Sequence, residues 1–317
     1  MENSIINSTI NDINHQINKK LFIIDTSALI FRSHYAYPTL INKNGMAIGA
    51  TYGFIHNIIR FLSSFDINQT NYIVMALDIG GKKTIRHEMF SEYKANRQPC
   101  PNEIINQFPG IISIINAFGI AMVKNEKYEA DDCIATCANI AKKNKIETFV
   151  VSGDKDLLQL VNETVKCFDP FKDIIIDQEG VMKKFGIKPS QLADYLALMG
   201  DATDNIPGAK GIGPKNAQKL LEKYLSVKEI YDNIDNITPI RIRELLEKSK
   251  KNVDLSYKLS SLYYNVDIEN SLDDWLWCGF PNNGNDLIEI FKFHGFKQIN
   301  KRIDNLIKKF NKFSTNI

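Results

Sequence analysis

The sequence predicts an α/β protein whose first part holds a mainly parallel, Rossmann-like sheet and whose second part is helical. Three observations support this fold class. Short apolar segments alternate with stretches of helical periodicity up to about residue 185, and mostly helical periodicity follows from residue 186. The composition, with 44% hydrophobic and 24% charged residues in a chain of 317, is that of a globular protein with room for one large or two modest domains.

The composition also favours some environments over others. No apolar run approaches the roughly 20 residues that cross a bilayer, and the N-terminus has neither a basic n-region nor an apolar stretch, so we expect a cytoplasmic protein without membrane contact. The net charge of +2 gives no nucleic-acid signal by itself, because a total conceals how charge is distributed. The cysteines show no paired CxxC spacing and are expected to be reduced core residues: Cys100, Cys133, Cys137, Cys167 and Cys278.

The first part of the chain has the rhythm of a parallel sheet covered on both faces. We expect residues 1–19 to form a flexible N-terminal extension and residues 20–185 to form the α/β domain. Strands are expected at 21–25, 72–78, 119–124 and 148–154. Helices are expected at about 54–62, 104–115 and 129–144, and a basic, broken segment occupies residues 82–101.

The second part, residues 186–303, is expected to be helical. Apolar residues share one helical face at 192–199 and again at 217–224, and the turn-rich segment GDATDNIPGAKGIGPK lies between these two helices. Residues 304–317 are expected to form a basic C-terminal tail. The basic side chains near this end are Lys297, Lys301, Arg302, Lys308, Lys309 and Lys312.

Acidic residues stand where three of the expected strands end, at Asp25, Asp78 and Asp154. Ligands of open parallel sheets bind in the crevice beyond the carboxyl ends of the strands, so these three side chains should converge. Asp156 projects from the same face as Asp154 if the chain stays extended there. Each acid taken singly could instead cap a helix or form a turn. The remaining acids of the group open a helix or flank a turn: Glu129, Asp131, Asp132, Asp201 and Asp204.

Nine carboxylates directed toward one crevice would repel one another and resist ionisation, so they make physical sense mainly around bound cations. Oxygen-only ligands favour Mg²⁺ or Mn²⁺ over zinc or copper. A cluster this rich can hold two ions roughly 4 Å apart, the arrangement that activates a water and stabilises the leaving oxygen in phosphodiester cleavage. The leading reaction class is therefore phosphoryl chemistry, and no His, Ser or Cys is placed as an obvious covalent nucleophile.

The basic segment 82–101 alternates cations with aromatic residues. If the segment is helical, Arg86, Phe90, Tyr93, Lys94 and Arg97 lie along one stripe. The plainer interpretation is a solvated helix with an aromatic pair packed beneath it. Beside a metal crevice, however, such cations neutralise phosphates and an aromatic ring stacks on an unpaired base for roughly 1–3 kcal/mol.

A tight glycine turn follows Asp204. Gly208, Gly211 and Gly213 leave it without side chains, so its backbone N–H groups can approach a DNA phosphate at a helix N-terminus. A turn of this kind between helices often serves only to permit a close crossing. Three lysines would supplement it as phosphate contacts: Lys210, Lys215 and Lys219.

These motifs, in this order and spacing, resemble the 5′ nucleases of the flap endonuclease type, and in particular the N-terminal 5′-3′ exonuclease domain of bacterial DNA polymerase I. The resemblance runs from about residue 20 to about residue 303. The residues that carry it are Asp25 with Arg32, Asp78, R-H-E from Arg86, Y-K-A-N-R from Tyr93, Y-E-A-D-D from Tyr128, S-G-D-K-D from Ser152, G-D-A-T-D-N from Gly200 and G-x-K-G-I-G from Gly208.

The resemblance implies a PIN-like sheet with a helical arch at about 82–101 and a helix-hairpin-helix element at 208–213. It implies two or more Mg²⁺ or Mn²⁺ ions, with Glu129, Asp131, Asp132, Asp154 and Asp25 nearest one ion and Asp156, Asp201 and Asp204 toward the other. Lys94, Arg97 and Arg86 would contact the scissile phosphate or the single-stranded 5′ end, with Arg32 supporting the phosphate from below. The hairpin would grip duplex backbone and bind K⁺.

The implied activity is structure-specific 5′-3′ exonuclease and flap endonuclease cleavage of DNA, including RNA primer ends, at 5′ ends, nicks and flaps in replication and repair. We expect a nucleoid-associated monomer that works beside a separate DNA polymerase chain. Two alternatives stay open: a non-catalytic DNA-junction module, and an RNase of the related toxin-like group. All nine acids argue against the first, and the arch and glycine hairpin argue against the second.

Overall fold

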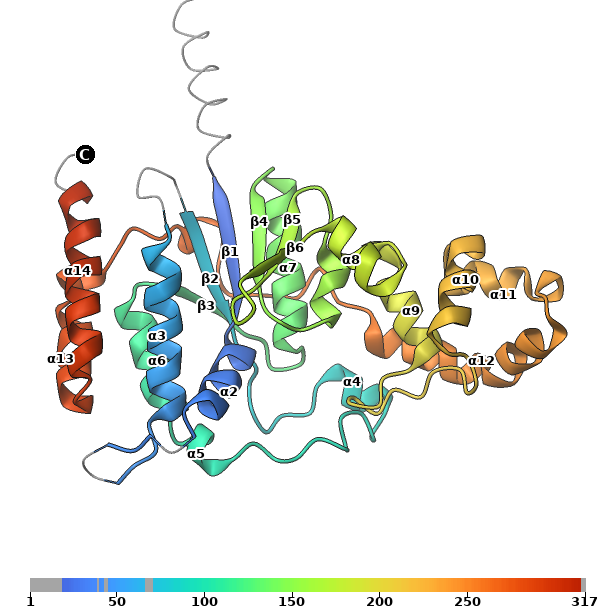
Figure 1. Ribbon diagram of the computed structural model, residues 1–317, viewed down its shortest axis with the longest axis horizontal. Coiled ribbons are helices and arrows are strands. Elements are labelled where there is room, and N and C mark those ends of the chain that lie inside the picture. Colours follow the sequence, from blue (N-terminus) through green and yellow to red (C-terminus); the bar gives the residue numbers. More distant parts are fainter. Residues whose placement is uncertain (1–18, 39, 43–44, 66–70, 315–317) are drawn as a thin grey trace, which may run out of the picture.

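The computed structural model describes residues 19–38, 40–42, 45–65 and 71–314, so most of the expected extension 1–19 lies outside the described residues. It confirms the predicted fold class: one mostly parallel sheet with helices, followed by a helical region (Figure 1). The strand order is β3-β2-β1-β4-β5-β6, and only the β5–β6 pair is antiparallel. The strands are β1 (Lys20–Asp25), β2 (Asn71–Ala76), β3 (Ala121–Val123), β4 (Glu147–Val151), β5 (Val165–Asp169) and β6 (Ile174–Ile176).

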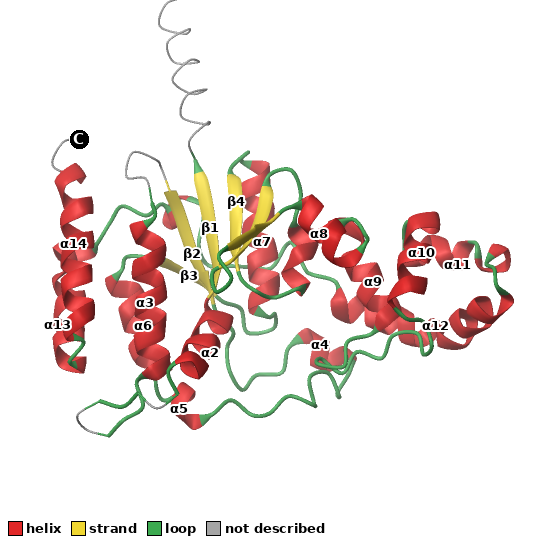
Figure 2. Ribbon diagram, viewed as in Figure 1, coloured by secondary structure: helices red, strands yellow, loops and turns green. Residues whose placement is uncertain are grey.

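Each face of the sheet has its own core, because successive side chains of a strand point to opposite faces. Leu21 and Ile23 of β1 pack with helix α7 (Ala130–Lys143), whereas Ile24 packs into a second cluster on the other face. Helices α2 (Thr26–Ala36), α3 (Gly49–Ser63) and α6 (Phe108–Ala117) cover that second face (Figure 2). The two layers hold the strands rigidly, and therefore also the residues at their carboxyl ends.

The helical region lies beyond the β6 side of the sheet (Figure 1). Gly208, in the turn before α10, has φ +63°, and a Cβ there would lie 2.3 Å from the backbone nitrogen of Gly200. This glycine therefore serves a close approach of two backbones. No helix among the described residues is both long and apolar enough to cross a membrane. The region comprises α8 (Gln178–Phe185), α9 (Leu192–Met199), α10 (Pro214–Tyr224), α11 (Val227–Asp232) and α12 (Ile240–Ser260).

The chain then returns to the α/β domain through α13 (Asn285–His294) and α14 (Lys297–Ser314). Ile303 and Ile307 of α14 belong to the same apolar cluster as α3. The Lys309 ammonium donates to the backbone oxygens of Ser63 (3.2 Å), the last residue of α3, and of Phe65 (2.9 Å), just past it. The boundary that we placed at residue 303 therefore falls inside a packed helix, because the apolar stripe of α14 continues past that point.

The basic segment 82–101 is helical only at α4 (Ile85–Met89), with α5 (Asn102–Ile105) following it. Lys94 has φ 58°, a left-handed backbone, and its N–H donates to the Asp204 carbonyl at 3.0 Å. The Asn205 side chain donates to the Glu92 carbonyl at 2.8 Å. These bonds to the 201–206 turn replace helical hydrogen bonds, so the single stripe expected for a continuous helix does not form.

Candidate active site

A pocket of about 390 Å³ opens at the carboxyl edge of the sheet. Its volume lies within the range of ligand sites. Arg32, Lys94 and Arg97 line it together with Ser27, Ala28, Phe31 and Gln98. The structure brings seven of the nine predicted acids to this pocket: Asp25, Asp78, Glu129, Asp131, Asp154, Asp156 and Asp204.

Local hydrogen bonds fix several of these acids. Asp25 caps α2, with its Oδ1 accepting the Ala28 N–H at 3.0 Å and its Oδ2 accepting the Ser152 hydroxyl at 2.7 Å. Asp78 Oδ1 accepts the Ala130 N–H at 2.8 Å, at the start of α7. Asp25 and Asp78 thus accept N–H groups at helix starts, as expected for single acids, and they also line the pocket.

Asp154 and Asp156 are held by a turn. Asp156 begins a 3₁₀ helix, and its N–H donates to Asp154 Oδ1 at 2.9 Å. The chain is therefore not extended between them, contrary to the geometry that we considered, although both line the pocket.

Three of the pocket carboxylates resist ionisation. Burial, together with the charges of Asp78 and Asp154, raises the pKa of Asp25 to about 6. Burial and the charge of Asp154 raise the pKa of Asp156 to about 7, and burial with neighbouring carboxylates raises the pKa of Asp131 well above its usual range. Carboxylates are crowded here without enough cations to balance them.

The donor set fits a hard divalent cation. All of the pocket acids offer oxygen, the ligand that Mg²⁺ and Mn²⁺ prefer, and Asp156 Oδ1 is buried without a hydrogen-bond partner. As the side chains are placed, no three of the described His, Cys, Asp or Glu residues enclose a metal position. Two of the pocket acids, Glu129 and Asp204, form ion pairs with Lys94 and Arg97.

Lys94 and Arg97 of the basic segment line the pocket and pair with its acids. The Lys94 ammonium lies 2.7 Å from Glu129 Oε1 and 3.9 Å from Asp204 Oδ2, and Arg97 Nε donates to Asp204 Oδ1 at 3.0 Å. Burial alone would raise the pKa of Glu129, but Lys94 and Arg86 together lower it below its usual value. The expected positions of Lys94 and Arg97 beside the acids are thus found in the structure.

Asp201 stands beside the pocket and pairs with a residue that the sequence did not single out. Its Oδ2 lies 2.6 Å from the Lys155 ammonium, and its Oδ1 accepts the Thr203 N–H at 2.9 Å. Burial raises the pKa of Asp201, but Lys155 outweighs this effect and lowers it overall. The sequence did offer a signal for Lys155, because this lysine stands between Asp154 and Asp156 in the S-G-D-K-D motif.

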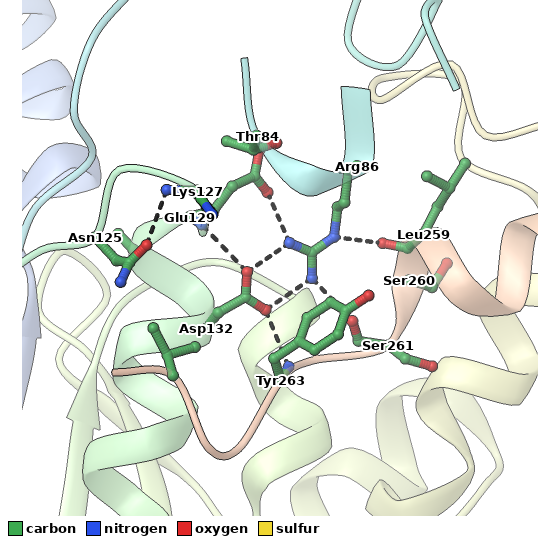
Figure 3. A network of polar contacts seen from close by, with 12 residues as sticks. Thr84, Arg86, Asn125, Lys127, Glu129, Asp132, Leu259, Ser260, Ser261 and Tyr263 are labelled. Atoms are coloured by element: carbon green, nitrogen blue, oxygen red, sulfur yellow. Dashed lines mark hydrogen bonds and ion pairs between the residues drawn. The ribbon is translucent and has the colours of Figure 1, made fainter. Parts of the chain in front are cut away.

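Asp132 and Arg86 do not line the pocket, and their expected places at an ion and over the phosphate require correction. Asp132 is fully buried, and its two carboxylate oxygens accept hydrogen bonds from the two terminal nitrogens of Arg86, at 2.6 and 2.8 Å (Figure 3). Asp132 also accepts the N–H of Glu129 as part of a capping box. Its carboxylate points away from Asp131, because neighbouring side chains in the first turn of a helix diverge.

Arg32 lines the pocket from α2. Its guanidinium lies 3.7 Å from Asp169 and 4.9 Å from the ring centre of Phe171, two residues that the sequence did not single out. A Cβ at Gly153 would lie 2.5 Å from the Arg32 guanidinium. Gly153 thus leaves room for this cation beside the acids.

The expected aromatic platform does not form. Tyr93 is 4% exposed, and its hydroxyl donates to Glu129 Oε2 at 3.1 Å, so its ring is unavailable for stacking on a base. Phe90 is half-buried in the same small apolar cluster, with Ile206 and Leu259. Both rings support the segment from below.

The glycine hairpin does not line the pocket. Gly208 is buried, Gly211 has φ +90°, and Gly213 caps α10, with Lys215 in the first turn of that helix. Lys210, Lys215 and Lys219 are exposed. Contact of these residues with DNA stays a prediction.

The parallel sheet, with the acidic pocket at its carboxyl edge and the cations above it, defines a PIN-like α/β domain. Comparison with known proteins agrees with this class. Residues 20–186 match the family described as the 5′-3′ exonuclease N-terminal resolvase-like domain, and residues 187–283 match the 5′-3′ exonuclease C-terminal SAM fold. The chain belongs to the 5′-3′ exonuclease family.

Relatives of two lengths share this similarity. The 5′-3′ exonuclease of Aquifex aeolicus is 38% identical over 81% of this chain and 86% of its own length. The DNA polymerase I of Caldicellulosiruptor bescii is 37% identical over 90% of this chain, which spans only 33% of that polymerase. The chain thus covers about a third of such polymerases.

Solved structures with the same fold include two DNA complexes. The bacteriophage T5 flap endonuclease, solved with DNA and metal ions, aligns with a TM-score of 0.62 at 18% identity, covering 91% of this chain and 99% of that one. The catalytic core of Rad2 with DNA substrate aligns at 0.61 and 16% identity, covering 92% and 94%. At these identities the likeness shows the fold.

Proposed function

We propose that this chain is a divalent-metal-dependent 5′-3′ exonuclease and flap endonuclease. Its substrates are DNA 5′ ends, nicks and flaps, including RNA primer ends, and it acts at the nucleoid in replication and repair. The observation that carries the proposal is the pocket itself, in which seven carboxylates meet at the carboxyl edge of the sheet beneath Lys94 and Arg97. Acids alone would repel a phosphodiester, and cations alone would not activate water.

Two or more Mg²⁺ or Mn²⁺ ions are held by the seven pocket acids, with Asp201 beside them. When bound, they supply an activated water and neutralise the charge that develops on the phosphate oxygens. The solved relatives described as holding metal ions support this assignment. K⁺ at the hairpin 208–213 belongs to the same proposal.

Three cations bind and orient the scissile phosphate in this proposal: Lys94, Arg97 and Arg32. Lys94 and Arg97 exchange their carboxylate partners, Glu129 and Asp204, for phosphate oxygens when substrate is present. Their charge then stabilises the negative oxygens of the transition state at the moment of cleavage. The irregular backbone at Lys94 fits this task, because it holds the ammonium over the pocket without a helix.

The exposed lysines of the hairpin position duplex DNA by its backbone, without reading its sequence. Gly213 and the start of α10 offer backbone N–H groups to a phosphate. We propose a monomer that works with a DNA polymerase, since some relatives carry the same domain within DNA polymerase I.

The test is digestion of end-labelled 5′-flap, nicked and blunt duplexes with Mg²⁺, with EDTA as the control. We expect products cut at or near the junction of the duplex and the 5′ strand, and no product with EDTA. Binding of flap DNA without cleavage would favour a non-catalytic junction module. Faster cleavage of single-stranded RNA than of the flap would favour a toxin-like RNase and refute the proposal.

A further inference from the structure

Arg86 occupies a buried junction between three segments that are far apart in the sequence. A guanidinium has five N–H hydrogens. Nε donates to the Leu259 carbonyl at 2.8 Å, and Nη2 donates to the Ser261 carbonyl and to Asp132, both at 2.8 Å. Nη1 donates to Asp132 at 2.6 Å and lies 3.5 Å from Glu129 Oε2. Four hydrogen bonds and the ion pair with Glu129 thus hold the guanidinium (Figure 3), so it cannot turn to a phosphate without breaking them.

Asp132 is equally occupied. Its Oδ2 accepts from Arg86 and from the Glu129 N–H at 3.2 Å, and its Oδ1 accepts from Arg86 and from the Tyr263 N–H at 3.0 Å. Two bonds at each oxygen use the lone pairs that a metal ion would need. The Tyr263 ring closes the junction, with its centre 5.6 Å from the guanidinium carbon.

The three segments joined here have different tasks in the proposed function. Helix α4 is the base of the basic segment that carries Lys94. The start of α7 presents Glu129 and Asp131 to the pocket. Residues 259–263 form the end of α12 and the segment that follows it. Helix α12 packs on α9, and its Ser256 accepts the Gly208 N–H of the hairpin at 2.9 Å.

We infer that Arg86 and Asp132 are positioning residues that lock Glu129, the base of the basic segment and the end of α12 into one arrangement. Neither contacts the ions or the substrate. This inference rests on the proposed function and deepens it, because the junction couples the DNA-gripping helices to the pocket. A bidentate, charge-assisted pair is suited to this task, since it fixes orientation as well as distance.

The experiment compares the same change at three carboxylates: Asp132→Asn at the junction, Asp131→Asn in the pocket, and Asp194→Asn as the matched control. Asp194 is buried in α9 and accepts the Val227 N–H at 2.8 Å, and it does not line the pocket. Three quantities are measured for each variant of the full chain. They are Mn²⁺ affinity by electron paramagnetic resonance, kcat and KM on 5′-flap DNA with Mg²⁺, and the melting temperature.

We expect Asp132→Asn to bind Mn²⁺ within about threefold of the wild type and to lower kcat about 10- to 100-fold, with KM nearly unchanged, as for residues that orient a first shell. Asp131→Asn should weaken Mn²⁺ binding at least about tenfold. Asp194→Asn should lower the melting temperature without a comparable loss of kcat. A loss of kcat without a loss of Mn²⁺ binding indicates a positioning role, whereas a lower melting temperature without a loss of kcat indicates a merely structural role.

A second variant, Arg86→Lys, keeps the positive charge but not the fork of donors. It should reproduce the kcat loss of Asp132→Asn, because one ammonium cannot serve the acceptors on both the start of α7 and residues 259–261. Full activity in Arg86→Lys would overturn the inference, and so would Mn²⁺ binding weakened in Asp132→Asn as much as in Asp131→Asn. If the wild type cut no flap DNA, the proposed function would fail, whereas the Mn²⁺ comparison would still decide whether Asp132 is a ligand.

Discussion

The pocket and the Arg86–Asp132 junction treat two neighbouring aspartates in opposite ways. Asp131 lies in the pocket among like charges, and burial and those charges raise its pKa well above the usual range. Asp132, the next residue, is fully buried, and its carboxylate accepts hydrogen bonds from Arg86, Glu129 and Tyr263. Adjacent residues of one helix turn thus serve two separate sites.

The difference shows how to tell a candidate ligand from a structural acid. An acid that has oxygens without hydrogen-bond partners and lies among other carboxylates is destabilised in its charged form, and a bound cation removes that repulsion. An acid whose oxygens are all occupied has nothing left to offer a ligand. Residue type and spacing do not separate the two cases, but the count of hydrogen-bond partners does.

The largest effect is expected for Asp131→Asn. Removing one of the pocket carboxylates should lower turnover on flap DNA by about 10³-fold or more, because it removes a ligand of the ions that activate water. Single-turnover cleavage with Mg²⁺ measures the effect, and filter binding of branched DNA should change little. A smaller loss than that of Asp132→Asn would break the comparison.

A loss of about 10²-fold is expected for Lys94→Ala, because this ammonium would stabilise the transition-state charge at the phosphate. Comparison of kcat and KM on the same flap substrate provides the measurement. Lys155→Ala is the matched control, since Lys155 pairs with Asp201 outside the pocket lining. If Lys94→Ala raised KM alone, the assigned role in the chemical step would be wrong.

The crowded pocket should also make metal-free stability depend on pH. The pKa of Asp25 is about 6 in the folded protein, above its ordinary value of 3.8. Between about pH 4 and pH 7 the unfolded chain therefore loses this proton more readily than the folded protein does. The free energy of unfolding falls as pH rises through this range. In Asp25→Asn the side-chain oxygen can still accept the Ala28 N–H that caps α2, and the group that titrates is gone, so this pH-dependent loss of stability disappears. The variant should therefore be more stable than the wild type at pH 8 in EDTA, by about 1–3 kcal/mol, and nearly equal to it at pH 4.

Urea unfolding of both proteins in EDTA measures that difference directly. Saturating Mg²⁺ should reverse it at pH 8, because the wild type gains the binding energy of the ions. An Asp25→Asn variant that is less stable than the wild type at pH 8 without metal would show that the pocket is not crowded with charge.

The smallest effect is expected for Gly153→Ala, which tests the wall of the pocket. The added Cβ would displace the end of the flexible Arg32 side chain, so turnover should fall about three- to tenfold while stability changes by less than about 1 kcal/mol. Gly110→Ala in α6, where a Cβ meets nothing within 4 Å, is the control. Equal rates for the two variants would argue against a role for Arg32 at the phosphate.

Much of the pocket was predictable because it follows from strand ends. Asp25, Asp78 and Asp154 follow apolar strands of a parallel sheet, and that topology alone brings them to one edge. The predicted fold class was confirmed for the same reason, since alternating strands and helices leave few other arrangements. Strands β5 and β6 were not predicted, although β5, with five residues, is as long as β4.

The placement of Arg86, Tyr93 and Asp132 was not predictable from periodicity. A helical stripe assumes regular backbone, whereas residues 90–101 follow contacts with the 201–206 turn, more than 100 residues away. The partners of Arg86 at Leu259 and Ser261, and the partner of Asp132 at Tyr263, are equally distant in sequence. Long-range side-chain contacts of this kind leave no local signal.

The parallel pairing of β1 with β2 and β4, in which Lys20 lies opposite both Asn71 and Glu147, has a consequence for how this gene tolerates change. One residue inserted into β1 would advance the chain by about 3.3 Å and turn Asp25 toward the other side of the sheet. Length errors within these strands should therefore be tolerated far less well than conservative replacements. Natural variation in length is expected to gather in surface loops away from this edge.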